Sequence, residues 1–499
     1  MHWLRQSPWA VVPTDKDGGY CLVSKHYLSL VHQEILAKKW YEPYPRGLFP
    51  TFRNLAKEYT NLARKVAILE GDENMARAMQ QSLAGGEQHV VRQLNVTVKS
   101  HKPAGHVTFR NIHGGAFYPF AGLGAWLAHN LQKSLRMLPH ILRNTGDLVT
   151  QLAKFQSSSS FVFVKVDIKD YFMSGTREEL RQRGSELLYD EIRDVGKEAI
   201  DFLLSHQYVR SEHFPQSVWQ VIVGTGMGLN FSGELSDAAF YAMAERWMMD
   251  NPGTFDSAGI LGYWRFKDDI LVVVKQDHLS PFKAWYEHMK EKSGSFKLEV
   301  ETVNQDQATF LDLDLHVQTR KGVNGEPTFC IAFEPHFKKT SLGVPLSHTS
   351  SHPWHVHASW PFAELRRLRR LSSNFSAYDN ARQVFVSRLI DNFSPSVLTS
   401  QLLSYCPPVQ TVLCWEGCTW IREGLGEGEK PHSPQTKWLV LPFHFVWESA
   451  CLTSVANKFL RSHEAQLLWS KAWGTSPDFK IGIAWKSTFP PVATRLKNI

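Results

Sequence analysis

The distribution of apolar residues along this chain predicts a small number of well-defined strands and helices. Residues 161–166 are almost continuously apolar and lead to an acid, Asp167, which is the pattern of a buried strand. Residues 263–274 place apolar and β-branched stretches on both sides of a Lys-Asp-Asp turn, the pattern of a hairpin. Between them, the glycine-rich residues 221–233 lead into a helix predicted over residues 234–250. The order is therefore an acid-ended strand, a glycine loop with its helix, and an acidic hairpin.

Weaker patterns extend this outline to the rest of the chain. Apolar residues recur at helical spacing near the N-terminus, so residues 1–95 are predicted to be largely helical. A further helix is expected over residues 281–293. A linker rich in Gly, Glu and Pro over residues 417–434 precedes a predicted strand near Trp438 and a predicted helix over residues 449–460.

Two neighbouring acids, Asp268 and Asp269, occupy the predicted hairpin turn. Successive side chains of an extended strand point to opposite faces, so only a turn lets adjacent aspartates share one site. Two carboxylates held together repel each other unless a cation lies between them, and magnesium takes oxygen ligands. Two such ions can stabilise the attacking and leaving oxygens of a phosphoryl transfer. Most Asp-Asp pairs are solvated turn residues, so the metal-site hypothesis depends on a third carboxylate.

Asp167 is the candidate for that third carboxylate. A strand beside the hairpin would bring Asp167 next to Asp268 and Asp269 and place three acids around one metal site. An acid at the end of a strand is more often a helix cap or a turn residue. The glycine loop also has two interpretations, because glycines either allow close approach to a ligand or form a flexible turn. The loop matches neither the P-loop nor the Rossmann spacing.

The acid-ended strand, the glycine loop with its helix and the acidic hairpin follow the order of motifs A, B and C in the palm of nucleic-acid polymerases. In these motifs the chain resembles reverse transcriptases, and among them most closely the Penelope-like element type, over nearly its whole length. Four further segments resemble other parts of that family: an Asp-Lys segment at 12–19, a Lys-x-His-Lys-Pro motif at 99–103, a palm strand at 310–315 and the start of the thumb at 350–353.

The resemblance implies an α+β fold with right-hand polymerase architecture. It would contain fingers, a palm built on an antiparallel sheet flanked by helices, a helical thumb and a small C-terminal α/β module. The corresponding segments are residues 1–95, a helical region leading into the fingers; 96–160, the fingers; 161–335, the reverse transcriptase palm; 336–405, the helical thumb; 406–435, a linker; and 436–499, the C-terminal module.

The resemblance also assigns roles to individual residues. Asp167, Asp268 and Asp269 would be catalytic and would hold two Mg²⁺ ions, for which Mn²⁺ can substitute. The nucleotide-binding residues would be Lys102 and Arg110 on the triphosphate, Asp170 beside it, Phe172 against a ribose 2′-hydroxyl, and Gly226 and Gly228 along the base and template. Without the resemblance, Phe172 is equally a core aromatic, and Lys102 and Arg110 are surface cations.

The implied activity is that of an RNA-directed DNA polymerase, a nucleotidyltransferase that adds deoxynucleotides to a primer 3′-hydroxyl by two-metal phosphoryl transfer. Its partners would be an RNA template, a DNA or RNA primer and deoxynucleoside triphosphates. Three alternatives are a catalytically silent, domesticated remnant that binds nucleic acid, an RNA-templated RNA polymerase and an unrelated metal-dependent phosphohydrolase. In the resembled family, a bulky residue at Phe172 argues against the RNA polymerase. The phosphohydrolase leaves the basic segment described below unexplained.

The chain departs from the family pattern in several places. Arg110 stands in Phe-Arg-Asn-Ile where the family has Arg-Pro-Ile, the Ser-Pro after the Met-Gly of motif B is missing, and residues 173–175 replace Asn-Ile-Pro. These changes affect nucleotide handling and leave the three acids in place. No GIY-YIG endonuclease signature follows the thumb segment, so we expect a copy that does not nick its own target. Because the Asp-Lys segment lies close to Met1, we also expect a truncated N-terminus.

Charge and composition add a candidate nucleic-acid surface. The formal net charge is +7, and four arginines lie in one predicted helix: Arg366, Arg367, Arg369 and Arg370. Leu365, Leu368 and Leu371 form an apolar edge of this helix, so the arginines are expected to lie away from it and to contact a phosphate backbone. A solvated helix face is the ordinary alternative.

No apolar run reaches membrane-spanning length and no signal-peptide core is present, so we expect a soluble, intracellular protein with no membrane partner. A nuclear location follows from the resemblance alone. The six cysteines include no C-x-x-C pair. Cys406, Cys414, Cys418 and His432 fit no common zinc template, and reduced thiols are the simpler interpretation. The sequence does not determine an oligomeric state.

Overall fold

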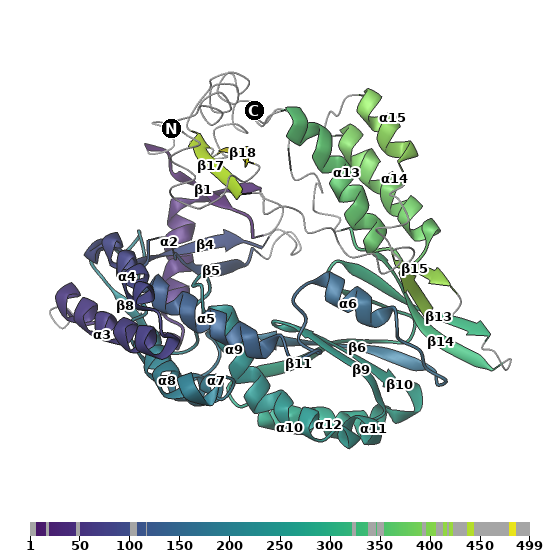
Figure 1. Cartoon of the computed structure of the whole chain (residues 1–499), viewed down its shortest axis with the longest axis horizontal. Helices are drawn as coiled ribbons and strands as arrows, with labels where there is room; N and C mark the ends of the chain where they lie inside the picture. The colour runs from purple at the N-terminus through teal and green to yellow at the C-terminus, as the bar shows by residue number, and fades with distance from the viewer. Residues whose placement is uncertain are drawn as a thin grey trace. The chain divides into compact units, whose positions relative to one another are not determined.

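In the computed structural model of the chain, a four-stranded antiparallel sheet in the order β11-β6-β10-β9 carries the predicted strand and hairpin (Figure 1). The strands are β6 (Phe161–Lys169), β9 (Ile260–Phe266), β10 (Asp269–Lys275) and β11 (Lys297–Asn304). Helices α11 (Gly253–Ala258) and α12 (Leu279–Lys292) lie along one face, and α6 (Thr145–Leu152) lies along the other. The apolar runs of β6 and β10 are therefore buried, as a strand covered on both faces requires.

The structure describes residues 6–15, 19–45, 50–99, 107–115, 117–321, 326–337, 346, 354–391, 396–405, 413–416, 419–422, 437–443 and 479–485. The chain divides into two compact units, Met1–Ser341 and Leu342–Ile499, and each is described by itself. Several expectations fall outside the described residues: those on Lys102, on residues 350–353, on the helix over 449–460, on most of the 417–434 linker, and on Cys406, Cys418 and His432.

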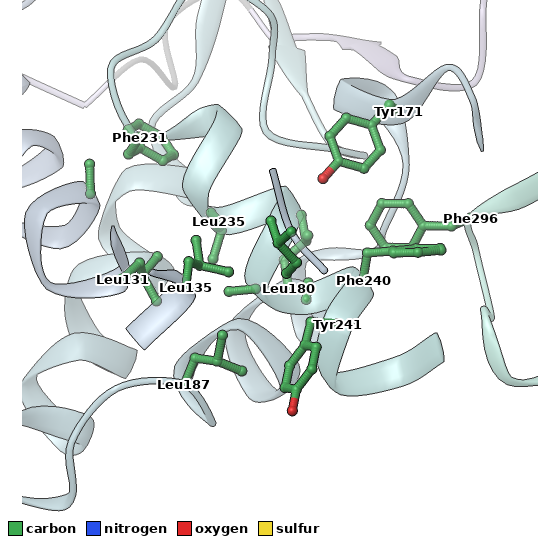
Figure 2. Packing of buried hydrophobic residues seen from close by; sticks show 14 of the residues in the cluster. Leu131, Leu135, Tyr171, Leu180, Leu187, Phe231, Leu235, Phe240, Tyr241 and Phe296 are labelled. Carbon is green, nitrogen blue, oxygen red and sulfur yellow. The ribbon is translucent and has the colours of Figure 1, made fainter. Parts of the chain in front are cut away.

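The chain between β6 and β9 contains several helices that pack on one another. They are α7 (Arg177–Ser185), α8 (Asp190–Ser205), α9 (Ser232–Phe240), the π-helical turn η4 (Tyr241–Glu245) and α10 (Arg246–Asp250). The helix predicted over residues 234–250 thus exists as three consecutive segments. The apolar face of these segments and that of α5 (Ala121–Leu135) belong to one large hydrophobic core. Leu180, Leu235, Phe240 and Phe296 are fully buried in this core (Figure 2).

The N-terminal part contains the helices that the spacing of its apolar residues predicts, and it also contains strands. The helices are α2 (Lys25–Leu36), α3 (Phe52–Glu70) and α4 (Glu73–Gln81), followed by the short turns η1 (Ser82–Gly85) and η2 (Glu87–His89). A hairpin is formed by β1 (Trp9–Pro13) and β2 (Tyr20–Ser24), and a five-stranded sheet has the order β3 (Tyr41–Pro43), β8 (Trp219–Val221), β7 (Tyr208–Arg210), β4 (Val91–Val98) and β5 (Phe109–His113). Strands β3 and β4 pair with segments more than a hundred residues away, which local spacing does not reveal.

The remaining elements are short helices and smaller sheets. The first unit adds η3 (Tyr171–Met173), η5 (Gln276–His278) and a three-stranded sheet of β12 (Gln307–Phe310), β13 (Leu313–Lys321) and β14 (Pro327–Pro335). The second unit contains α13 (Trp354–Arg370), α14 (Phe375–Asp391), α15 (Ser396–Ser404), the hairpin of β15 (Leu413–Glu416) and β16 (Thr419–Arg422), and the parallel pair β17 (Lys437–Phe443) and β18 (Phe479–Trp485). The strand predicted near Trp438 is β17. Within the described residues, none of the helices combines the length and the apolar character needed to span a membrane.

Three glycines in the loop before α9 have left-handed backbone conformations. Their φ angles are 81° at Gly224, 71° at Gly226 and 111° at Gly228. A Cβ atom on Gly228 would lie 2.5 Å from the backbone oxygen of His113, and one on Gly226 would collide with the His113 ring. The N–H of His113 donates to the carbonyl oxygen of Met227 at 2.7 Å. The glycines therefore let this loop pack directly on the end of β5.

We expect Gly228→Ala to lower the free energy of unfolding by about 2 kcal/mol or more, because the new methyl group meets backbone at a strained φ. Gly253→Ala is the matched control, since nothing lies within 4 Å of a Cβ atom at Gly253. That control should change stability by no more than about 1 kcal/mol. Urea unfolding followed by circular dichroism measures both. Equal stability of the two variants would contradict the close-packing explanation.

Candidate active site

Three aspartates lie together at one end of the central sheet. Asp167 in β6 is directly opposite Asp269 in β10, so their side chains lie on the same face. Asp268 occupies the β9–β10 turn, where Lys267 has a left-handed φ of 55°. The N–H of Ile168 donates to the Asp268 carbonyl oxygen at 2.9 Å, which holds the turn against β6. The register thus brings together the three acids that the sequence analysis expected to be neighbours.

Burial and mutual repulsion disfavour the ionised forms of Asp268 and Asp269. Burial raises the pKa of Asp268 to about 6, and the charges of Asp269 and Asp167 add to the shift. Burial also raises the pKa of Asp269, where Lys165 opposes the shift and Asp167 increases it. The cluster is therefore electrostatically strained without a counter-charge.

Two lysines of β6 partly neutralise the cluster. Side chains alternate along a strand, so Lys165, Asp167 and Lys169 project from the same face. The ion pairs are Lys169 Nζ to Asp167 Oδ2 at 2.8 Å and to Glu299 Oε2 at 3.4 Å, and Lys165 Nζ to Asp269 Oδ1 at 3.5 Å and to Glu301 Oε2 at 3.1 Å. Each ammonium group therefore joins one acid of the cluster to one glutamate of β11.

The donor set fits a hard divalent cation, because Mg²⁺ takes carboxylate oxygens and would relieve the repulsion at Asp268. In the described part of the chain, no group of three or more His, Cys, Asp or Glu side chains is arranged to hold a metal ion. A cation held by Asp167 or Asp269 would therefore replace a lysine as the counter-charge of that carboxylate.

A cavity of about 860 Å³ opens beside Asp268 and Asp269. It is lined by cations from distant parts of the first unit, Lys38, Lys99, Arg110, Arg143, Lys165 and Lys267, and also by His336. Among these residues, the sequence predicts a site role only for Arg110. Lys165 comes from the middle of β6 and the other cations come from separate segments, so only the tertiary fold brings them to one cavity. Their charge makes the cavity suitable for a phosphate-rich ligand.

Asp170 and Phe172 line the same cavity. Asp170 has a left-handed φ of 50°, which turns the chain out of β6. Phe172 is partly buried and packs against the hydrophobic core, so its position fits both a core aromatic and a wall of a nucleotide site. Arg110 also lines the cavity and forms an ion pair with the buried Asp15 at 3.5 Å.

The structure does not bring Gly226 or Gly228 into the lining of this cavity. Met227, between them, lines it instead, and the glycines lie against His113. Gly226 and Gly228 therefore have a packing role, and the expectation that they contact base and template stays a prediction. Glycine spacing alone could not distinguish the two roles, because both require close approach of the backbone.

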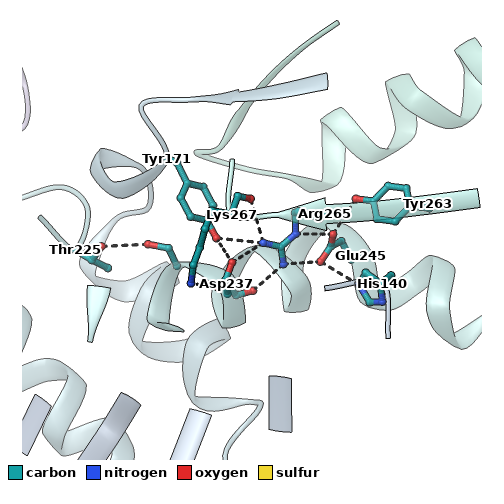
Figure 3. A network of polar contacts seen from close by, with 9 residues as sticks. His140, Tyr171, Thr225, Asp237, Glu245, Tyr263, Arg265 and Lys267 are labelled. Atoms are coloured by element: carbon teal, nitrogen blue, oxygen red, sulfur yellow. Dashed lines mark hydrogen bonds and ion pairs between the residues drawn. The ribbon is translucent and has the colours of Figure 1, made fainter. Parts of the chain in front are cut away.

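A fully buried arginine, Arg265, lies two residues before the acidic turn (Figure 3). Its guanidinium forms ion pairs with Asp237 Oδ1 at 2.6 Å and Glu245 Oε1 at 2.8 Å. The Tyr171 hydroxyl donates to Asp237 at 2.6 Å and the Tyr263 hydroxyl to Glu245 at 2.8 Å. Burial opposes ionisation of Glu245, but the charges of Arg265 and His140 outweigh it and lower its pKa to about 2.

This network fixes the position of the turn. Arg265 Nη1 donates to the carbonyl oxygen of Lys267 at 3.2 Å, and Lys267 Nζ lies 2.5 Å from Asp237 Oδ2. Glu245 is the last residue of the π-helical turn η4, a type of irregularity that is frequent at functional sites. Sequence reasoning missed Asp237 and Glu245. The helix predicted over residues 234–250 also contains Glu234, Arg246 and Asp250, so no sequence signal singled out Asp237 and Glu245.

The arginines of α13 do not form one free stripe. Arg366 donates to the Tyr405 hydroxyl at 3.1 Å, Arg367 pairs with Glu364 at 2.7 Å, and the Arg369 guanidinium lies 5.7 Å from the Tyr378 ring centroid. The predicted apolar edge is present, because Leu365, Leu368 and Leu371 are buried. Arg366 and Arg370 are exposed and Arg367 and Arg369 are partly buried, and the expectation that the four arginines contact a phosphate backbone stays a prediction.

No protein-family model matches the chain, and no curated protein matches it in sequence. Among solved structures, it is similar to telomerase from Candida albicans in complex with the TWJ fragment of telomeric RNA, with a TM-score of 0.52 and 10% identity. That match covers 80% of this chain and 63% of the telomerase chain. Apo telomerase from Candida tropicalis gives a TM-score of 0.45 at 10% identity, covering 79% of this chain and 65% of that one.

At 10% identity, the likeness to the Candida albicans telomerase concerns the fold alone. It supports a mixed helix-and-sheet fold similar to that of the telomerase, and it does not single out the Penelope-like type. The chain spans about 63% of the length of that telomerase.

Replacing Asp268 by Asn should stabilise the protein when divalent cations are removed. The folded pKa of about 6 exceeds the ordinary aspartate value of 3.8, so the folded state binds more protons and loses stability as the pH rises through this window. In EDTA at pH 7 we expect Asp268→Asn to raise the unfolding free energy by about 1–2 kcal/mol, with a much smaller gain at pH 4.5. Asp277→Asn, at an exposed position, should give no gain. Urea unfolding at the two pH values measures this, and a gain independent of pH would contradict it.

Proposed function

We propose that the chain is an RNA-directed DNA polymerase, a reverse transcriptase that adds deoxynucleotides to a primer 3′-hydroxyl. One observation carries the proposal: the register of β6 and β10 sets Asp167 opposite Asp269 and beside Asp268, at a cavity lined with cations. A reverse-transcriptase-like fold supports the same activity. Carboxylates for cations and ammonium groups for phosphates are what nucleotidyl transfer requires of a protein.

In this proposal, the reaction forms a bond between the primer 3′-oxygen and the α-phosphorus and breaks the bond from that phosphorus to the leaving pyrophosphate. Asp167, Asp268 and Asp269 would hold two Mg²⁺ ions, or Mn²⁺ in their place. The bound ions would lower the pKa of the attacking hydroxyl and stabilise the charge on pyrophosphate. The cavity cations, Arg110 and Arg143 among them, would draw in and orient the triphosphate. Phe172 would form the wall next to the sugar.

The finer assignment to the Penelope-like type rests on the order and spacing of the sequence motifs. An RNA template and a DNA or RNA primer are the proposed partners. The Candida albicans telomerase was solved with a fragment of telomeric RNA, which supports an RNA partner for this fold.

A second candidate function is that of a catalytically silent remnant that binds nucleic acid. The pairing of Lys169 with Asp167 and of Lys165 with Asp269 favours it, because these ammonium groups compete with a divalent cation. Primer extension separates the two candidates.

The double variant Asp268→Ala/Asp269→Ala should reduce primer extension on an RNA template by at least about a thousandfold, because it removes two cation ligands. Labelled deoxynucleotides with Mg²⁺ or Mn²⁺ provide the readout, and thermal melting verifies the fold. Asp277→Ala is the control, since Asp277 is exposed and does not line the cavity. Unchanged extension in the double variant would refute the site. No extension by any of the proteins, with primer–template still bound, would favour the silent remnant.

Phe172→Val tests whether the aromatic wall excludes ribonucleotides. If Phe172 contacts the sugar, the smaller side chain should raise the ratio of ribonucleotide to deoxynucleotide incorporation by about tenfold or more. If Phe172 serves only the core, both activities should fall together with thermal stability. Single-nucleotide kcat/KM values for a matched ribo- and deoxynucleotide distinguish these outcomes. An unchanged ratio would exclude the sugar contact.

A further inference from the structure

A second cavity of about 460 Å³ adjoins the first one within the Met1–Ser341 unit. The two cavities share four wall residues: Lys38, Trp40, Asp170 and Met173. From this common wall, the second cavity extends along the segment that follows Asp170, as far as Thr176, and to the start of β11. It therefore lies directly behind the part of the chain that turns out of β6.

The lining of this second cavity is strongly basic. It contains Lys38, Lys39, Lys169 and Lys297, against one lining acid, Asp170. Within the described part of the chain, Lys38, Lys39 and Lys297 form no ion pair, whereas Lys169 is shared between Asp167 and Glu299. These lysines come from the end of α2, from β6 and from β11, so no single helix face or charged run accounts for them. Lys38, Lys39 and Lys297 are solvent-exposed, and what groups them is that all three line the same hollow.

Two serine hydroxyls of the lining already donate hydrogen bonds within the protein and its tryptophan ring is covered, so the lysines are the groups that can recognise a ligand. The Ser174 hydroxyl donates to the carbonyl oxygen of Asp170 at 3.1 Å, and the Ser295 hydroxyl donates to Glu179 at 2.6 Å. Lys38 Nζ lies 4.6 Å from the centroid of the Trp40 ring, and Trp40 is 7% exposed. That ring is therefore covered and does not offer a face on which a nucleic-acid base could stack.

We propose that this second cavity is a subsite for a diphosphate group. A compact ligand with several negative charges matches a small hollow lined by ammonium groups, which bind phosphate as point charges. The covered tryptophan disfavours a single-stranded nucleic acid as the occupant. The inference rests on the proposed function, because nucleotidyl transfer consumes a triphosphate and releases pyrophosphate. The shared wall of Lys38 and Asp170 gives such a group a direct path between the two cavities.

Lys39→Met/Lys297→Met tests this subsite without touching the first cavity, since neither residue lines the first cavity. Binding of inorganic pyrophosphate to the full chain is measured by calorimetry in EDTA, so that the lysines and not a metal ion hold the probe. Loss of two of four cations should weaken binding by about tenfold or more. Lys283→Met/Lys292→Met on α12 is the matched control, because it removes the same charge from exposed positions outside both cavities. This control should bind within about twofold of wild type.

A parallel titration with a deoxynucleoside triphosphate separates the two sources of the diphosphate group. Equal losses for both probes assign the subsite to the triphosphate of an incoming nucleotide, and a loss for pyrophosphate alone assigns it to the released product. Wild-type affinity for pyrophosphate in Lys39→Met/Lys297→Met, or an equal loss in the control, overturns the proposal. The proposal is also overturned if replacing Lys39 and Lys297 weakens the binding of an oligodeoxythymidylate and leaves the binding of pyrophosphate unchanged.

The same measurement distinguishes a failure of the subsite from a failure of the proposed function. In EDTA, Asp268→Ala/Asp269→Ala should bind pyrophosphate at least as tightly as wild type, because two like charges near the path are removed. Lysine-dependent binding in a protein that never extends a primer would retain the subsite and reject the polymerase. Primer extension by a protein whose pyrophosphate binding does not depend on Lys39 and Lys297 would retain the polymerase and reject the subsite.

Discussion

The buried charge of Arg265 is the constraint on which the candidate site depends. A guanidinium without solvent exposure is strongly destabilising unless it is fully paired, and Asp237 and Glu245 supply the two opposite charges. Arg265 belongs to β9, whereas Asp237 belongs to α9 and Glu245 to the π-helical turn after it. The pairing therefore fixes the helix that follows the glycine loop against the strand that enters the acidic turn. Removing either partner would leave an unpaired charge in the core, so hairpin and helix cannot shift independently.

A second constraint, which involves no charged groups, acts on the opposite end of α9. Gly226 and Gly228 let the loop before that helix contact the backbone and ring of His113 at the end of β5. The loop thereby joins the five-stranded sheet to the helix that Arg265 holds from the other side. Arg110, on β5, consequently faces the same cavity as Asp268 and Asp269, although more than a hundred residues separate them. Two close contacts at the two ends of one helix thus hold the strand of Arg110 and the turn of Asp268, both of which line the cavity.

How much of this arrangement follows from the sequence depends on the range of each interaction. The apolar strand before Asp167 and the hairpin at Asp268 and Asp269 are local patterns, and their pairing followed from their both being buried and acidic at one end. The pairings of β3 with β8 and of β4 with β7 escaped prediction because the partner strands lie far away in the sequence, although β4 also pairs with the nearby β5. The acids Asp237 and Glu245 were hidden in a helical pattern, where an ordinary surface position is the default. The glycines were assigned to a ligand because sequence cannot tell approach to a ligand from approach to another strand.

The alternation of β6 leads to a final consequence for the charges of the site. Lys165 and Lys169 flank Asp167 at a spacing of two residues, so the strand itself presents acid and base on one face. A divalent cation bound by Asp167 and Asp269 would be repelled by the ammonium groups of Lys165 and Lys169 unless these groups moved toward the glutamates of β11. Glu299 and Glu301 already lie 3.4 and 3.1 Å from them, and a bulge between Val300 and Thr302 brings Glu301 into reach. The sheet therefore contains alternative partners for both lysines, and the proposed cation binding would leave each ammonium group with a glutamate of β11 as its counter-charge.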